Sequence, residues 1–356
     1  MDHAGNMDNT PAGMAKILSD QYEAVFSDPI DLELDINNIP ASIIEDIAFT
    51  EDCIKKAINE LANNAAPGPD GFPALLLKNC KDELAKPLYI LWRVSLDTGE
   101  IPEQLKISHI TPVYKGGSRH AAKNYRPVAL TSHIIKIFEK VIRAALVEFI
   151  ESNNLMNPNQ HGFRAGRSCL SQLLQHQDKI TSLLEEGFNV DVIYLDFSKA
   201  FDKLDIDITL QKLLKMGVTN KLFHWLKAFL TNRKQLVLVE GSKSDPVAVR
   251  SGVPQGSVIG PLMFLVLLQD IDHETRFSHV ASFADDTRIL SGIRETEDVE
   301  NLQKDLTKVF DWALYNNAKF NPDKFECMRY GTNENLKQST SYTSCNGTPI
   351  ECSEHV

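Results

Sequence analysis

The 356-residue sequence has no apolar run long enough to cross a bilayer and no N-terminal segment that resembles a secretory signal. Its longest strongly apolar run, Leu262 to Leu268, is far shorter than the about 20 residues that a spanning helix needs. The opening residues MDHAGNMDNT lack the basic and apolar regions of a signal peptide. We therefore expect an intracellular protein of the nucleus or the cytoplasm that is neither secreted nor held in a membrane.

Closely spaced cysteine pairs are also missing. The six cysteines are scattered without a CxxC pair, at Cys53, Cys80, Cys169, Cys327, Cys345 and Cys352. This spacing predicts reduced thiols and not a disulfide framework. Near the end, Cys345, Cys352 and His355 could form part of a zinc knuckle, but their spacing matches no common zinc pattern, so zinc binding is the less favoured interpretation.

An excess of positive charge, which binding to nucleic-acid phosphates would favour, is absent as well: the net charge is −11. Residues 1–52 account for all of it, with 12 Asp/Glu and one Lys, and the remainder holds 36 basic and 36 acidic side chains. Residues 101–180 carry 11 Lys/Arg against 5 Asp/Glu. The composition is therefore compatible with a neutral body that has a basic segment.

Apolar periodicity predicts an α+β protein. Residues 1–50 are interpreted as an acidic, largely irregular linker with one short helix at 14–26. Further helices are expected from 51, over 74–96 with an interruption at Pro87, and over 128–150, 170–184, 210–230, 258–268 and 299–315. Strands are expected over 109–114, 190–195, 279–283 and 287–290, with a hairpin formed by 235–240 and 247–250.

Two sites place acidic side chains at the end of an apolar strand. Asp196 follows Val192 to Leu195, and Asp285-Asp286 follows Val280 to Phe283. A carboxylate buried at a strand end is costly unless it is paired or binds a metal. If the two ends adjoin, they can hold two Mg²⁺ ions, or Mn²⁺, as in phosphoryl transfer. The alternative is that these residues are ordinary turn acids.

The residues around these acids form a series of motifs. They are YLDFSKAFD at 194–202, GVPQGSVIGP at 252–261, FADD at 283–286, Trp312 with Asn316-Asn317, and NPDK at 321–324, preceded by APGPDG at 66–71, PVYK at 112–115, NYRPV at 124–128 and QHGFR at 160–164. The series, in this order over residues 50–332, resembles the reverse transcriptases of non-LTR (LINE-type) retrotransposons, with most similarity to the jockey-like elements.

The resemblance implies the fingers and palm of a right-hand polymerase, with a small antiparallel palm sheet packed on helices. It implies a fingers region with an N-terminal extension over 51–190, a palm over 191–332, and a truncated tail over 333–356. The family's thumb would follow this chain and its endonuclease would precede it, so we expect both in the full-length polyprotein and interpret the chain as a fragment.

The resemblance also assigns roles at the catalytic centre. Asp196, Asp285 and Asp286 are implied to be the metal ligands, with the backbone carbonyl of Phe197 completing one coordination sphere. Phe201 is implied to be a steric gate that excludes a ribose 2′-OH; the alternative is that its ring only packs in the core.

Other roles concern the substrates. Lys115 and Arg126 are implied to grip the incoming triphosphate, where Arg offers a bidentate fork and Lys a point charge. Gln255 would contact the nucleotide or template, and Gly256 would let the backbone approach closely. The remaining assignments are Lys324 as the acid that protonates the leaving pyrophosphate, and Arg164 and Arg167 as contacts to template phosphates.

The implied function is an RNA-directed DNA polymerase that joins dNTPs to a DNA primer 3′-OH on an RNA template. Two alternatives are weighed against it. One is an inactive truncated remnant that only binds nucleic acid. The other is a maturase of the group II intron type, which would need a basic region after the palm.

Overall fold

A computed structural model describes residues 8–30, 32–35, 40–331 and 341–354. The chain forms two compact units. The first unit comprises residues 1–155 and 201–263, and the second comprises 156–200 and 264–356. Each unit is therefore built from two separate stretches of sequence. Each domain expected from the sequence is instead one continuous range of residues, and these boundaries stay predictions.

The first unit contains a sheet built on β1 (Ile107–Tyr114). β1 pairs antiparallel with β2 (Tyr125–Leu130) and parallel with β4 (Arg233–Val239). β4 also pairs with two short strands, β5 (Ser242–Lys243) and β6 (Val247–Val249). These pairings confirm the expected strand over 109–114 and the hairpin that follows residue 235.

The acidic N-terminal segment contributes a helix to the first unit. α1 (Pro11–Glu23) begins where the Thr10 side chain accepts a hydrogen bond from the Gly13 N–H at 3.1 Å, which satisfies one of the free donors at the helix start. Its Leu18 and Tyr22 are buried against β-sheet residues such as Val237. Part of the predicted linker is therefore ordered because it covers apolar surface of the sheet.

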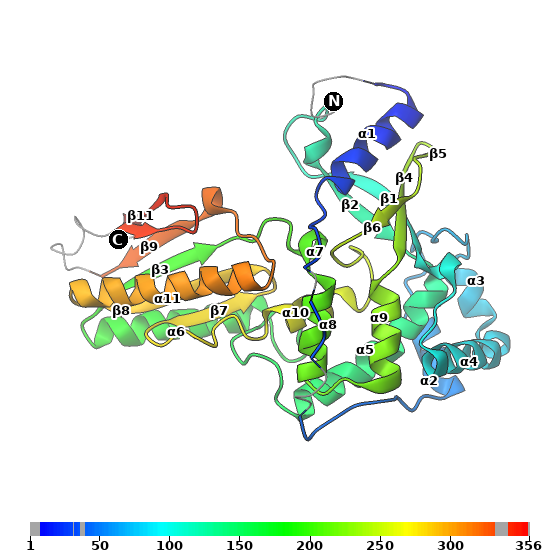
Figure 1. The fold of residues 1–356 in the computed structure, drawn as a ribbon, viewed down its shortest axis with the longest axis horizontal. Coiled ribbons are helices and arrows are strands. Elements are labelled where there is room, and N and C mark those ends of the chain that lie inside the picture. Colours follow the sequence, from blue (N-terminus) through cyan, green and yellow to red (C-terminus); the bar gives the residue numbers. More distant parts are fainter. Residues whose placement is uncertain (1–7, 31, 36–39, 332–340, 355–356) are drawn as a thin grey trace. The chain divides into compact units, whose positions relative to one another are not determined.

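Helices form the remainder of the first unit (Figure 1). They are α2 (Glu51–Asn59), α3 (Ala74–Asn79), α4 (Lys81–Thr98), α5 (His133–Ser152), α8 (Ile206–Lys215) and α9 (Asn220–Leu230), with α7 (Ala200–Lys203) and α10 (Gly260–Leu268) at the unit boundaries. Their core includes the stacked rings of Trp92 and Phe138, with centroids 4.8 Å apart, and Phe138 also meets Trp225 edge to face.

Three helix predictions in this unit need correction. The helix expected over 210–230 is two helices, because Gly217 at φ +92° turns the chain between α8 and α9. The interruption expected at Pro87 lies instead at Cys80, and α4 continues through the proline. The helix expected from 128 begins at His133, since the preceding residues extend β2.

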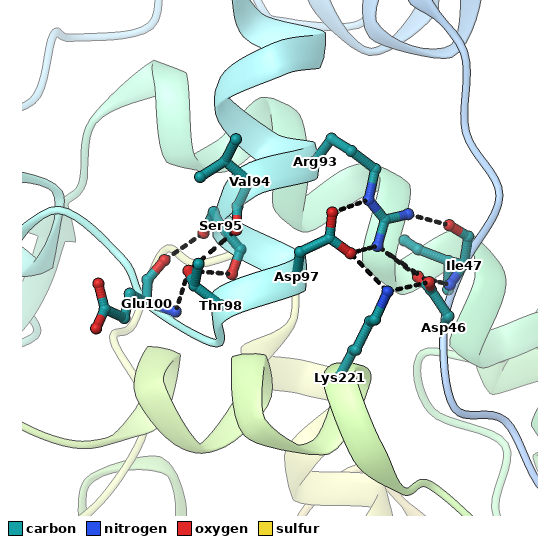
Figure 2. A network of polar contacts seen from close by, with 9 residues as sticks. All are labelled: Asp46, Ile47, Arg93, Val94, Ser95, Asp97, Thr98, Glu100 and Lys221. Carbon is teal, nitrogen blue, oxygen red and sulfur yellow. Dashed lines mark hydrogen bonds and ion pairs between the residues drawn. The ribbon is translucent and has the colours of Figure 1, made fainter.

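An ion-pair network ties the segment before α2 to α4 and α9 (Figure 2). Arg93 of α4 pairs with Asp46 at 2.9 Å and with Asp97 at 2.8 Å, and Lys221 of α9 pairs with Asp97 at 2.6 Å. Hydrogen bonds from Arg93 and Lys221 lower the pKa of Asp97. These partly exposed pairs fix orientation more than they stabilise the fold, because solvent screens them.

A six-stranded sheet in the order β10-β11-β9-β3-β8-β7 forms the centre of the second unit. The strands are β3 (Asn189–Leu195), β7 (His279–Phe283), β8 (Asp286–Ile293), β9 (Glu326–Tyr330), β10 (Ser341–Thr343) and β11 (Pro349–Glu354). All neighbouring pairs are antiparallel except β9 with β11. The sheet and its helices confirm the expected α+β class.

Two helices accompany this sheet. α6 (Cys169–Glu185) packs Ile180 against Val190, Val192 and Leu290, and α11 (Thr296–Tyr315) packs against β8. Because side chains alternate along a strand, the covered face of β3 carries Val190 and Val192 while Asp191 points to the other face.

The expectation of six reduced cysteines is wrong for one pair. Cys327 of β9 and Cys352 of β11 lie opposite each other in the parallel register and form a disulfide. They are 25 residues apart in sequence, so only the strand pairing brings them together. Cys352 is thereby unavailable to the zinc site that was considered, and His355 lies outside the described residues.

A buried ion pair lies beside the disulfide. The Asp191 carboxylate accepts hydrogen bonds from Arg329 Nε at 2.6 Å and from the Tyr342 hydroxyl at 2.6 Å. Both charged side chains are almost fully buried. The hydrogen bonds that Arg329 donates to Asp191 raise the pKa of Arg329, and burial raises the pKa of Tyr342. This cluster joins β3 to β9 and to β10.

Within the described part of the chain, no helix combines the length and the apolar character that crossing a membrane requires.

We predict that Asp191→Ala lowers the free energy of unfolding of the second unit by about 3–5 kcal/mol, because it leaves the Arg329 guanidinium buried without its partner. Urea denaturation followed by tyrosine and tryptophan fluorescence measures this loss. Asp311→Ala, which removes an exposed acid from α11, serves as the control. Equal stability of the two variants would contradict the structural role of the pair.

Candidate active site

The three predicted carboxylates lie at one end of the sheet in the second unit. β3 pairs with β8 so that Leu195 lies opposite Thr287. One residue further along each strand, the same register brings Asp196 next to Asp286. β7 and β8 form a hairpin in which Phe283 pairs with Asp286, leaving Ala284 and Asp285 as its two-residue turn. The register thus brings both acidic strand ends together.

The turn that carries Asp285 has an unusual backbone. Ala284 adopts φ +55°, in the left-handed region. Two-residue hairpin turns of the primed types need a positive φ at this first central position, and glycine or asparagine usually supplies it. The tight turn leaves Asp285 and Asp286 adjacent at the tip of the sheet.

Electrostatics show that these acids influence one another. Burial raises the pKa of Asp286, and the charges of Asp285 and Asp196 raise it further. Lys324 opposes this effect: its Nζ lies 3.0 Å from Asp196 Oδ2. A backbone hydrogen bond also brings the segment that carries Lys324 close to Asp196, because the Asn321 N–H donates to the Asp196 carbonyl at 2.8 Å. The site therefore has an excess of negative charge that a cation would relieve.

A cleft of about 570 Å³ opens at this end of the sheet. Its lining includes Asp196, Asp286, Lys324, Tyr194, Leu173 and Arg288. Arg288 lies outside the motifs and Tyr194 was given no role within its motif, although the strand pattern could have found both. Tyr194 lies opposite Arg288 in the β3–β8 register, and each is two residues from an acid on its own strand. Because side chains alternate along a strand, Tyr194 and Arg288 point to the same face of the sheet as Asp196 and Asp286.

The donor set suits divalent metal ions. Carboxylate oxygens are hard ligands of the kind that Mg²⁺ prefers. Among the described residues, the one trio of ligand atoms that lie within 4.8 Å of one another is Asp191 with the disulfide pair Cys327 and Cys352, so the three carboxylates at the sheet tip are spread more widely. Together these carboxylates could hold divalent metal ions, which would neutralise charge on the phosphates of a substrate.

Phe197 contributes its ring to the core and not to the cleft. The ring is buried and stacks on Phe320 with centroids 4.3 Å apart. The two residues also form an isolated antiparallel bridge. Only the backbone of Phe197 is therefore suited to the metal-ligand role that the resemblance implies, and that role stays a prediction.

The predicted triphosphate residues belong to the first unit. Val113 lies opposite Arg126 in the β1–β2 register, and the Lys115 N–H donates to the Asn124 carbonyl at 2.9 Å. Because alternate residues share a face, Lys115 and Arg126 point to the same side of the hairpin. Both side chains are exposed. The hairpin thus presents two cations together, as binding of a polyphosphate requires.

The predicted nucleotide contacts of the PQG turn lie beside this hairpin in the same unit. The Ala129 N–H of β2 donates to the Gln255 carbonyl at 2.8 Å, and a Cβ on Gly256, which has φ +136°, would lie 2.5 Å from the Ala129 carbonyl oxygen. The Gln255 side chain donates to Asp202 at 2.6 Å. Only glycine fits at 256.

Phe201 is connected to the same segment through its backbone. Its carbonyl accepts a hydrogen bond from the Val253 N–H at 2.9 Å, and a Cβ on Gly252 would lie 2.5 Å from that carbonyl oxygen. The Phe201 residue is half-buried. Its position next to the PQG motif is compatible with either the predicted gate or a packing role.

The two arginines predicted to meet template phosphates make contacts within the second unit. Arg164 Nη1 donates to the Asn157 carbonyl at 2.7 Å, and Arg167 Nη1 lies 3.0 Å from His161 Nε2. Arg167 and Arg164 help to lower the pKa of His161, after the larger effect of burial. Arg164 therefore stabilises its own loop, and contact of either residue with nucleic acid stays a prediction.

Comparison with known proteins agrees with this geometry. Residues 113–346 match the family described as reverse transcriptase (RNA-dependent DNA polymerase). The chain belongs to the reverse transcriptase family. The resemblance to retrotransposon enzymes that the motifs indicated is confirmed by its relatives.

Two relatives come from Drosophila melanogaster. The probable RNA-directed DNA polymerase from transposon BS is 29% identical over 280 residues, covering 76% of this chain and 31% of that protein. The RNA-directed DNA polymerase from mobile element jockey is 28% identical over 286 residues, covering 78% and 31% respectively. The chain thus spans about a third of the length of these relatives.

A solved structure supports the fold. The apo telomerase from Candida tropicalis truncated from its C-terminal domain superposes with a TM-score of 0.51 and 10% identity, covering 76% of this chain and 60% of that one. At this identity the likeness concerns architecture alone, and it agrees with the expected polymerase fingers-and-palm fold.

We predict that Mg²⁺ binding strengthens as the pH rises through the raised pKa of Asp286, because a proton on this carboxylate competes with the ion. Calorimetric titration with Mg²⁺ at a series of pH values, from the ordinary titration range of an aspartate upward, measures the effect. In Asp286→Asn the pH dependence should be weaker, since the competing proton is gone. An unchanged slope in that variant would rule out Asp286 as the titrating ligand.

Proposed function

We propose that this chain is the catalytic part of an RNA-directed DNA polymerase of a non-LTR retrotransposon, and that it joins dNTPs to the 3′-OH of a DNA primer. One observation carries the proposal: Asp196 and the Asp285-Asp286 pair meet at adjoining strand ends, beside Lys324 and in a cleft. Negative charge concentrated in this way is unfavourable unless cations bind there.

The protein's part in the reaction is positioning. Asp196, Asp285 and Asp286 would hold two Mg²⁺ ions, or Mn²⁺, together with the Phe197 carbonyl. Such ions lower the pKa of an attacking hydroxyl and neutralise charge on the phosphates. No nucleophile from the protein is needed, since the primer 3′-OH attacks the α-phosphate.

Lys324 is proposed as the acid that protonates the departing pyrophosphate. Its ammonium lies 3.0 Å from Asp196 and is largely exposed, so it can reach a phosphate in the cleft. The proton would pass from Nζ to the leaving oxygen.

The nucleotide-binding part of the proposal concerns the first unit. Lys115 and Arg126 would bind the triphosphate from one face of the β1–β2 hairpin. Gln255 and Gly256 would contact the base-paired nucleotide, for which the Gln255 amide must exchange its bond to Asp202 for one to the substrate. Phe201 would exclude a ribose 2′-OH.

The proposed partners are an RNA template, a DNA primer and dNTPs, with Arg164 and Arg167 directed to the template strand. An endonuclease and a thumb are proposed for the full-length polyprotein, which would act in the nucleus or cytoplasm. The second candidate function is an inactive remnant that still binds nucleic acid, and primer extension separates it from the enzyme.

We predict that Asp285→Asn/Asp286→Asn lowers primer extension by at least about 100-fold, because loss of metal coordination removes several kcal/mol of transition-state stabilisation. Extension of oligo(dT) on poly(rA) with dTTP and Mg²⁺ measures this. The control is Asp298→Asn, which changes an acid at the start of α11. Equal extension by wild type and the double variant would favour the remnant.

A further inference from the structure

The turn that carries Asp285 needs support from outside its own hairpin. Ala284 holds a left-handed φ of +55°, which an alanine rarely adopts. Residues in such conformations persist where neighbouring groups fix them, and they are frequent at active sites. The contacts around Ala284 therefore show which residues determine the position of the two carboxylates.

A single amide side chain makes these contacts. Gln160 Oε1 accepts a hydrogen bond from the Ala284 N–H at 2.9 Å, and Gln160 Nε2 donates to the Ala284 carbonyl at 3.2 Å. The same Oε1 accepts from the Gly162 N–H at 2.7 Å. The residue is 3% exposed, so water does not compete for these bonds. Both polar groups of the Ala284 backbone are thus bonded to Gln160.

Gln160 is itself held against the sheet by its backbone. It forms an isolated bridge with Ser282 on the hairpin strand β7. The His161 N–H donates to the Ser282 carbonyl at 3.0 Å, and the Ser282 N–H donates to the Asn159 carbonyl at 3.1 Å. The loop is closed by Arg164, whose guanidinium donates to the Asn157 carbonyl at 2.7 Å. The amide is therefore presented from a fixed support.

Gly162 shows how closely this loop approaches the turn. A Cβ at position 162 would lie 2.3 Å from the Ala284 nitrogen. The φ of Gly162 is not in the left-handed region, so glycine is needed for space and not for its backbone conformation. Any side chain here must push the turn away from Gln160.

An amide side chain offers an acceptor and a donor side by side at its end without carrying a charge. A carboxylate would accept two bonds but could not donate to the Ala284 carbonyl when ionised. It would also add a negative charge beside acids that already repel one another. Glutamine therefore matches both the hydrogen-bonding and the charge requirements of the position.

We propose that Gln160 is a positioning residue that holds the Ala284 turn, so that Asp285 and Asp286 are arranged for metal ions before these bind. This inference rests on the proposed function. It assigns Gln160 no contact with substrate. Preorganisation of this kind affects the rate because an error of about 1 Å in the placement of catalytic groups costs about 100-fold.

The test compares Gln160→Met, which keeps the size of the side chain and removes its hydrogen bonds, with wild type. We expect kcat for primer extension to fall about 10- to 100-fold. We expect little change in the KM for dTTP, since the proposed triphosphate residues, Lys115 and Arg126, belong to the β1–β2 hairpin of the first unit. The Mg²⁺ concentration for half-maximal rate should rise. Gln177→Ala, an exposed glutamine of α6, is the control.

A second readout does not depend on activity. Binding of Mg²⁺ to the folded protein raises its Tm. In Gln160→Met this Mg²⁺-dependent rise should be smaller than in wild type. A purely structural role would lower the Tm without Mg²⁺ and leave the rise unchanged. An unchanged rise together with an unchanged kcat would overturn the proposal.

Two further variants keep the proposal testable if Gln160→Met does not fold. Gly162→Ala leaves Gln160 intact and displaces the turn sterically, and it should change kcat and the Mg²⁺-dependent rise in the same direction. Gln160→Glu keeps the two accepted bonds and so keeps the fold, while its ionised form loses the donated bond. Wild-type values in both variants would contradict the positioning role.

Failure of this inference can be distinguished from failure of the proposed function. If Asp285→Asn/Asp286→Asn abolishes extension while the Gln160 and Gly162 variants behave as wild type, only the positioning role is wrong. If the double variant extends primers as wild type does, the polymerase assignment itself is wrong.

Discussion

The antiparallel register of β3, β8 and β7 places three carboxylates at one end of a sheet, against their mutual repulsion. Burial and the charges of its neighbours raise the pKa of Asp286, so the arrangement costs free energy in the absence of cations. Backbone hydrogen bonds along the three strands hold the acids together despite this repulsion. Lys324 and the Gln160 contact to Ala284 then determine how the acids are oriented.

Much of this site could be predicted from the sequence because it depends on short-range patterns. Val192 to Leu195 and Val280 to Phe283 are apolar runs that each end in an acid, and such runs predict buried strands with polar tips. The motif series then indicated which strand ends belong together. The meeting of Asp196 with Asp286 follows from strand pairing, which the motif order suggested and the register shows.

What could not be predicted depends on long-range pairing. Cys327 and Cys352 become partners only because β11 lies parallel to β9. Asp191 is inside an apolar strand, and its partner Arg329 is more than a hundred residues away. The helix break at Gly217 depends on a positive φ at this residue, and the sequence does not show which glycines adopt one. Gln160 had no assigned role because only the tertiary structure brings it to Ala284.

The most direct measurement is anomalous diffraction from crystals of the chain grown with Mn²⁺, which replaces Mg²⁺ and can be located by its scattering. We predict two peaks about 4 Å apart at the tip of the β3–β8–β7 sheet, each about 2.2 Å from carboxylate oxygens of Asp196 or Asp285. The absence of any peak at these residues, in crystals that bind Mn²⁺ elsewhere on the protein, would contradict it.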